Sequence, residues 1–139
     1  MKKEPAIKVM MMPKDTNSRG TIFGGVILSY IDQAGAVEAI KKGARRPVTV
    51  NMKEINFLKP VYVGDIVSFY TETLKIGTTS ITVRVRVVAE RIQNIGAELA
   101  SEEKEKGVVK EYSIEEEVTE AVVTYVNIDH NWKPMPIKI

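Results

Sequence analysis

One carboxylate in this sequence lies in an apolar segment, where burying a charged group is energetically unfavourable. Asp32 stands in the middle of TIFGGVILSYIDQAGAVEAIKK (residues 21–42), in which almost every other residue before the final lysines is apolar or small. A buried carboxylate without partners is strongly destabilised, so such a group finds hydrogen-bond donors or lies beside a cleft. Acids of this kind gather at functional sites, where they act as a general base or a nucleophile. A purely structural aspartate, bonded to a loop amide, is the alternative that the residues alone leave open.

Two glycines open the same segment and offer complementary chemistry. Gly24 and Gly25 stand where a helix would begin, at the positive end of the helix dipole. Backbone N–H groups at that end have no partner within the helix, so they can bind an anion or polarise a carbonyl. Tight packing of a helix start on a strand is the alternative. Further along the segment, Gly35 makes the helix less stable than alanine would, by about 1 kcal/mol. A close approach by another backbone or a ligand would explain a glycine at this position.

The composition excludes several other kinds of chemistry. The sequence contains no cysteine, which rules out a disulfide framework, a thiol nucleophile and a cysteine-ligated zinc site. Its single histidine, His130, cannot build a multi-histidine metal site within one chain, and it stands in the polar stretch DHNWKP. We therefore expect no metal, and we interpret His130 as a loop or subunit-contact residue.

Length and charge narrow the class of protein further. The chain has 139 residues, of which 44% are hydrophobic and 27% charged, and this suits one globular domain over residues 1–139. A net charge of +2 gives no dedicated surface for nucleic acid. No apolar run approaches the roughly 20 residues of a membrane span. The N-terminal apolar stretch is too short for a signal sequence, so we expect a cytoplasmic protein.

The elements that must hold Asp32 follow from periodicity and from helix-breaking residues. A single long helix is predicted from Gly24 to Lys42, ended by Gly43, and its apolar composition predicts burial nearly all round. Strands are predicted within residues 7–12, 47–60, 66–74, 77–92 and 118–128. The clearest of them alternates in polarity, with Ile81, Val83, Val85 and Val87 on one face and Thr82, Arg84 and Arg86 on the other.

This order of elements predicts an α+β fold. Strands joined by short turns form an antiparallel sheet with one buried face, which the single helix has to cover. We therefore expect one long central helix wrapped by a curved antiparallel β-sheet. The charged segment 94–117 is predicted to be an extended hairpin or an exposed excursion, with a short helix at Glu98–Lys106 as the alternative.

Three sequence motifs resemble a known family. They are MPKDTNSRGTIFGGVILSYIDQAGAVEA, NFLKPVYVGD and GTTSITV, and together they resemble the bacterial hotdog-fold acyl-CoA thioesterases, closest to the YciA type. The resemblance runs over about residues 9–93 and resumes in the last predicted strand. It implies the hotdog fold and hydrolysis of acyl-CoA to a free fatty acid and CoA, with no cofactor beyond the CoA of the substrate. It also implies an obligate homodimer, often assembled into a trimer of dimers, with active sites at the dimer interface.

The resemblance assigns roles to individual residues. Asp32 matches the catalytic carboxylate of the family, and Asn17 matches a loop asparagine that helps to place the thioester or the water, contributed by the other subunit. Gly24 and Gly25 match the helix start that polarises the thioester carbonyl. The segment expected near the pantetheine arm of CoA comprises Gly77, Thr78, Thr79 and Ser80, and the side chains that could meet a CoA phosphate are those of Arg84 and Arg86.

Several alternatives remain open at this point. Asp32 can act as base or as nucleophile, and a non-catalytic acyl-CoA-binding or regulatory protein would need the same pocket without Asp32. A dehydratase or isomerase is disfavoured because the helix and the preceding loop contain no histidine, and a nucleic-acid binder is disfavoured because the strand arginines have no exposed aromatic neighbours. Four aromatic residues are expected either to line the acyl pocket or to pack in the core, namely Tyr30, Phe57, Phe69 and Tyr70.

Overall fold

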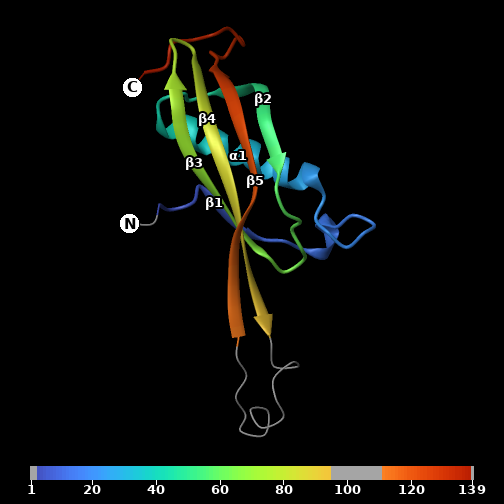
Figure 1. The fold of residues 1–139 in the computed structure, drawn as a ribbon. Helices are drawn as coiled ribbons and strands as arrows, with labels where there is room; N and C mark the ends of the chain where they lie inside the picture. The colour runs from blue at the N-terminus through green and yellow to red at the C-terminus, as the bar shows by residue number, and fades with distance from the viewer. Residues whose placement is uncertain (1–2, 95–110, 139) are drawn as a thin grey trace, which may run out of the picture.

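In the computed structural model, one helix packs against one face of an antiparallel sheet (Figure 1). The model describes residues 3–94 and 111–138. Within them, the helix is α1 (Gly24–Lys41), and a short 3₁₀ turn at Pro13–Asp15 precedes it. The five strands are β1 (Ile7–Met10), β2 (Pro47–Phe57), β3 (Ile66–Ile76), β4 (Ser80–Asn94) and β5 (Glu111–Asn127). The predicted α+β architecture is therefore confirmed.

The order of strands in the sheet differs from their order in the chain. The spatial order is β1-β3-β4-β5-β2, so β2 follows the helix in sequence but pairs with the last strand, β5. β3, β4 and β5 are joined in sequence and lie side by side as antiparallel neighbours. As a result β2 forms one edge of the sheet, and it is held there by residues some 80 positions later in the sequence, for example Pro47 opposite Asn127.

The core lies between α1 and the inner face of the sheet. Ile81, Val83, Val85 and Val87 of β4 are fully buried there, which confirms the predicted alternation along this strand. Figure 1 shows α1 crossing behind the sheet, where it contacts β2, β3, β4 and β5. Burying an apolar side chain of this size contributes roughly 1.5–3 kcal/mol, so these four side chains help to drive the packing of the helix on the sheet.

The expectation that the helix is buried nearly all round is wrong for the single chain. Its fully buried residues lie on one face and include Ile27, Ile31 and Ala39, whereas Ser29 is exposed and Ile40 is 52% exposed. One sheet can cover only one face of a helix, because the opposite face points away from it. The chain therefore leaves apolar helix surface uncovered.

The last strand begins earlier than residue 118, where it was predicted to start. β5 begins at Glu111, and its first residues pair with the end of β4 up to Asn94, so the described ends of segment 94–117 form the predicted extended hairpin. Figure 1 shows these two strands continuing past the rest of the sheet as a two-stranded ribbon. The glutamates at residues 115–117 hid this strand, because three consecutive charged residues break the polar–apolar alternation that marks a half-buried strand. The alternative helix at Glu98–Lys106 lies outside the described residues.

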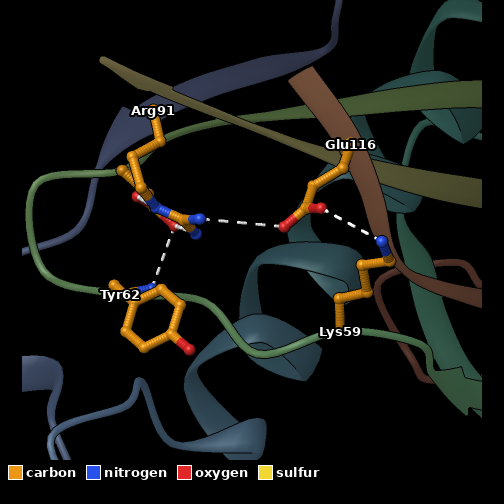
Figure 2. A network of polar contacts seen from close by, with 5 residues as sticks. Lys59, Tyr62, Arg91 and Glu116 are labelled. Carbon is orange, nitrogen blue, oxygen red and sulfur yellow. Dashed lines mark hydrogen bonds and ion pairs between the residues drawn. The ribbon is translucent and has the colours of Figure 1, made fainter. Parts of the chain in front are cut away.

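A cluster of charged side chains holds the base of this ribbon to the loop between β2 and β3 (Figure 2). Asp65, 1% exposed, accepts hydrogen bonds from Arg91 Nε at 2.8 Å and Nη2 at 2.7 Å, and from the Tyr62 amide at 2.9 Å. The Arg91 guanidinium also lies 4.5 Å from the centre of the Tyr62 ring, and Glu116 links it to Lys59. Because Asp65 is buried, its pairing with Arg91 fixes the loop that runs past the start of α1.

Gly35 of α1 is needed because Tyr125 of β5 passes directly over it. A Cβ atom at Gly35 would overlap the Tyr125 hydroxyl and come within 2.9 Å of its ring. The close neighbour expected at Gly35 is therefore a side chain from the sheet, and neither another backbone nor a ligand. This contact lets α1 lie close to β5.

We predict that Gly35→Ala lowers the free energy of unfolding by about 1–3 kcal/mol, because overpacking outweighs the better helix propensity of alanine. The measurement is urea unfolding at equilibrium. Gly25→Ala is the matched control, since no atom lies within 4 Å of the position of a Cβ at Gly25. Equal stability of both variants would show that Tyr125 does not constrain the helix.

We also predict that Asp65→Asn lowers the free energy of unfolding by about 2–3 kcal/mol, because it removes the charge that compensates Arg91. Glu116→Gln is its matched control. Glu116 is more exposed and lies 3.8 Å from Arg91, so its loss should cost less than about 1 kcal/mol. Thermal and urea unfolding of both variants test this difference, and a reversed order would place the main anchor at Glu116.

Candidate active site around Asp32

The carboxylate of Asp32 is held by a residue of the edge strand. Thr49 of β2 donates a hydrogen bond from Oγ1 to Asp32 Oδ1 at 2.5 Å. Asp32 itself is half-buried, less buried than its apolar helix suggested, and it has the hydrogen-bond donor that is expected of such a group. A hydroxyl donor limits rotation of the carboxylate, which leaves it oriented beside the surface of α1.

A second residue fixes the backbone of the same helical turn. The Tyr125 hydroxyl donates to the backbone oxygen of Asp32 at 2.6 Å. Burial, and then the negative charge of Asp32, raise the pKa of Tyr125, so the phenol keeps its proton and remains a donor. Thr49 and Tyr125 lie directly opposite each other in the register of β2 and β5. One cross-strand pair therefore positions both the side chain and the backbone of Asp32.

Sequence reasoning missed Thr49 and Tyr125. The register of β2 against β5 shifts between Thr49 and Asn51, which indicates a β-bulge at Val50. A bulge changes which side chains face the helix, so simple alternation along PVTVN could not place Thr49. A signal for Tyr125 was present in the glycine at position 35, but the sequence alone does not pair the two.

The start of α1 leaves its backbone donors free. The residue before the helix is Phe23, which has no side chain able to cap it, and the first turn contains no acidic residue. Within residues 3–94 and 111–138, the amides of Gly24 and Gly25 have no hydrogen-bond acceptor. Such amides can bind an oxyanion without losing an existing hydrogen bond.

A cavity of about 350 Å³ adjoins this helix start. It is bordered by Gly24 and Ile27 of the helix and by Phe57 and Leu58 at the end of β2. The ring of Phe57 lies 3.0 Å from the position of a Cβ at Gly24, so a larger residue there would displace it. Thr119 of β5 also borders this cavity, and its buried hydroxyl has no partner among the described residues.

Asn17 is used within its own loop. Its side-chain oxygen accepts hydrogen bonds from the amides of Arg19 at 2.8 Å and Thr21 at 3.2 Å, and its Nδ2 donates to the Thr21 hydroxyl at 2.7 Å. These bonds shape the loop that leads into α1. The structure of one chain does not bring Asn17 into contact with Asp32.

The other expected site residues lie elsewhere in the chain. The turn between β3 and β4 holds Gly77, Thr78 and Thr79, and Ser80 begins β4. The carbonyl oxygen of Thr78 accepts the amide of Ile137 at 2.8 Å. A Cβ at Gly43, just past the end of α1, would overlap the neighbouring Lys138, so this turn lies near the C-terminal end of the helix. It is thus distant from Gly24 and Gly25 within one chain.

Arg84 and Arg86 lie on the outer face of the sheet, which is the face opposite α1. Their positions alternate with fully buried valines that pack against the helix. Arg84 is opposite Glu72 of β3, and Arg86 is opposite Glu120 of β5. One chain does not bring these arginines to Asp32, and each already faces a carboxylate.

The four candidate aromatic residues divide between core and surface. Phe69 is fully buried and its ring centre lies 5.6 Å from that of Tyr30, so this pair belongs to the core. Tyr70 borders a cavity on the outer face. Only Phe57 lines the cavity beside Gly24.

Among the described residues, no group of three or more histidine, aspartate or glutamate side chains is arranged to hold a metal ion. In the same part of the chain, no helix is long and apolar enough to cross a membrane.

Comparison with known proteins places the chain in a family. The thioesterase superfamily matches residues 19–95. The acyl-CoA thioester hydrolase YciA of Salmonella typhimurium is 36% identical over 136 residues, which cover 98% of this chain and 91% of that protein.

Two solved structures are also similar. One is a hexameric hotdog-fold thioesterase of Campylobacter jejuni, with a TM-score of 0.83, 39% identity, and coverage of 98% of this chain and 91% of that chain. The other is a hexameric broad-specificity acyl-coenzyme A thioesterase, crystallised with one aspartate replaced by alanine; its TM-score is 0.78, its identity 34%, and the coverage 99% and 88%. The family expected from the motifs is therefore confirmed: the chain belongs to the thioesterase superfamily, with the hotdog fold, among the homologues of the YciA acyl-CoA thioester hydrolases.

Proposed function

We propose that this protein hydrolyses acyl-CoA thioesters, with Asp32 as the catalytic carboxylate and the amides of Gly24 and Gly25 as the donors to the thioester carbonyl. The observation that carries the proposal is the fixed position of Asp32, held by Thr49 and backed by Tyr125. A protein that only binds acyl-CoA has no need for an oriented carboxylate. The similar proteins described above are named as acyl-CoA hydrolases, which supports the same substrate class.

The reaction requires no cofactor besides the CoA of the substrate, because a thioester carbonyl is already activated toward attack. In one route, Asp32 takes a proton from water while the water oxygen bonds to the carbonyl carbon, and the C–S bond then breaks. In the other route, the carboxylate attacks the carbonyl and forms an anhydride that water hydrolyses. Both release the CoA thiolate, which takes up a proton. The negative charge on the carbonyl oxygen is stabilised by the helix-start amides in either case.

The complete site requires a second copy of the chain. Gly24 and Asp32 are eight residues apart on one helix, which corresponds to about 12 Å along its axis. One carbonyl carbon cannot contact both, so we propose that Asp32 of one subunit meets Gly24, Gly25 and Asn17 of the other.

The surface left uncovered supports this pairing. The edge strand β2 and the residue after it expose large apolar side chains, with Val50 56%, Phe57 55% and Leu58 52% exposed. An exposed apolar edge of this kind is normally covered by another strand or chain. We propose a homodimer through this edge and, because the similar structures are described as hexameric, a trimer of dimers.

We predict that Asp32→Asn lowers kcat by at least about a hundredfold, the scale of a general base, with the Kd for CoA nearly unchanged. Asparagine keeps the shape and the acceptor for Thr49, so packing is retained. The measurement is thiol release across acyl-CoAs from acetyl to palmitoyl, which also gives the range of chain lengths.

Thr49→Val should lower kcat about tenfold, whereas Thr49→Ser keeps the donor and should lower it little. Full activity of Asp32→Asn would contradict the proposed role, and CoA binding without any turnover by the unaltered protein would indicate a binding protein.

A second prediction concerns the sharing of the site between subunits. Asn17→Ala should lower kcat by tens of fold, and light scattering should show at least a dimer at micromolar concentration. Mixing Asp32→Asn with Asn17→Ala and allowing subunits to exchange should restore activity, because a mixed dimer has one site with both residues intact. If mixed dimers form without recovery, the site must be built within one chain.

A further inference from the structure

The cavity beside the start of α1 has room for more than a thioester carbonyl. Its volume is about 350 Å³, which lies in the range of small-molecule pockets. We refer to it as the helix-start cavity, and it is bordered by Gly24 and Ile27 of α1, Phe57 of β2 and Thr119 of β5. Most of the residues that line it are apolar, which suits an acyl chain better than the arm of CoA with its two amides.

Thr119 brings a polar atom without a partner to this apolar lining. The residue is 1% exposed, and its Oγ1 has no hydrogen-bond partner among residues 3–94 and 111–138. Buried hydroxyls in proteins are nearly always hydrogen-bonded, because an unpaired one is destabilising. The residues opposite Thr119 in the neighbouring strands are Phe57 and Val87, whose side chains carry no polar atom. A partner for the hydroxyl can reach it from the cavity that Thr119 borders.

Phe57 ties Thr119 to the start of the helix. Its ring lies 3.0 Å from the position of a Cβ at Gly24, and its backbone is directly opposite Thr119 in the register of β2 and β5. The next amide, that of Leu58, donates to the carbonyl oxygen of Val118 at 2.8 Å and holds the end of β2 on β5. The free amides of α1 and the unpaired hydroxyl therefore face one cavity from elements that are fixed to each other.

The other polar side chains that border the helix-start cavity already have partners. The Thr21 hydroxyl accepts a hydrogen bond from Asn17 Nδ2 at 2.7 Å, and Lys59 Nζ lies 3.3 Å from Glu116 Oε2. Because Glu116 balances its charge, Lys59 gives the cavity little attraction for an anionic acyl group. Thr119 instead offers a neutral hydroxyl, which can both donate and accept. The lining thus fits a neutral oxygen on an otherwise apolar chain.

We propose that the helix-start cavity binds the acyl group and that Thr119 is a specificity-determining residue, which favours chains carrying a hydroxyl over unsubstituted chains of the same length. This inference rests on the proposed function. A chain hydroxyl that reaches Thr119 Oγ1 gives it a partner, whereas a methylene group there leaves it unpaired. Sites with a buried polar group discriminate in this way against ligands that lack the matching group.

The test compares acyl-CoAs that differ by one hydroxyl. Butyryl-CoA is paired with its 3-hydroxy and 4-hydroxy derivatives, and hexanoyl-CoA with its 6-hydroxy derivative. For the unaltered protein, kcat/KM for the best hydroxyacyl-CoA should exceed that of its unsubstituted counterpart. Thr119→Val keeps the shape of the side chain and removes the hydroxyl, so it should lower this ratio about tenfold, the scale of one hydrogen bond.

Two further variants separate the hydroxyl from the rest of the side chain and from threonine in general. Thr119→Ser keeps the hydroxyl and should keep the preference. Thr82→Val is the matched control, because Thr82 of β4 lies 3.2 Å from Thr124 between their Oγ1 atoms and does not border the cavity. It should leave the ratio unchanged. In urea, Thr119→Val should be as stable as the unaltered protein, because the lost hydroxyl has no partner in the fold.

Calorimetric titration tests binding without turnover. In the Asp32→Asn protein, adding Thr119→Val should change the ratio of Kd values within the best pair about tenfold. The inference is overturned if no hydroxyacyl-CoA is preferred, if Thr119→Val changes kcat/KM equally for both members of each pair, or if it clearly lowers the free energy of unfolding, since the hydroxyl would then serve the fold. Absence of turnover by the unaltered protein would instead contradict the proposed function, and the calorimetry would still test Thr119.

Discussion

The contact between Tyr125 and α1 is the constraint on which the site depends. The ring passes over Gly35, and its hydroxyl donates to the backbone of Asp32, so β5 sets both the height and the rotation of the helix on the sheet. Thr49, paired with Tyr125 across β2 and β5, then orients the carboxylate. A helix packed only by apolar contacts could slide or rotate, because such contacts have little direction. Here one glycine and one cross-strand pair remove that freedom.

Much of the fold could be predicted from the sequence where local patterns decide the structure. The bounds of α1 followed from its glycines, and the buried valines of β4 followed from strict alternation. The start of β5 could not be predicted, because the consecutive glutamates around Glu116 break the polar–apolar alternation of a half-buried strand. The burial of the helix was overestimated, since one sheet covers only one face of the helix.

The candidate site was predictable to the extent that its residues are unusual for their local context. Asp32 is a charge in an apolar helix, and Gly24 is a glycine where a capping side chain would be favourable. Thr49 carries no such signal, because a threonine in a strand is ordinary and a bulge redirects it. The glutamates opposite Arg84 and Arg86 are also invisible in sequence, because the strand register decides which residues face each other.

The pairing of β2 with β5 has a consequence for the biosynthesis of the protein. Thr49 is made early and Tyr125 is made near the end, so the carboxylate of Asp32 acquires its partners only after most of the chain has left the ribosome. Contacts between residues so distant in sequence form slowly, because a long loop has to close first. A nascent chain that ends before β5 lacks Tyr125 and the strand that pairs with β2, so it holds no oriented carboxylate. The oriented carboxylate would then appear late, once the final strand has been inserted.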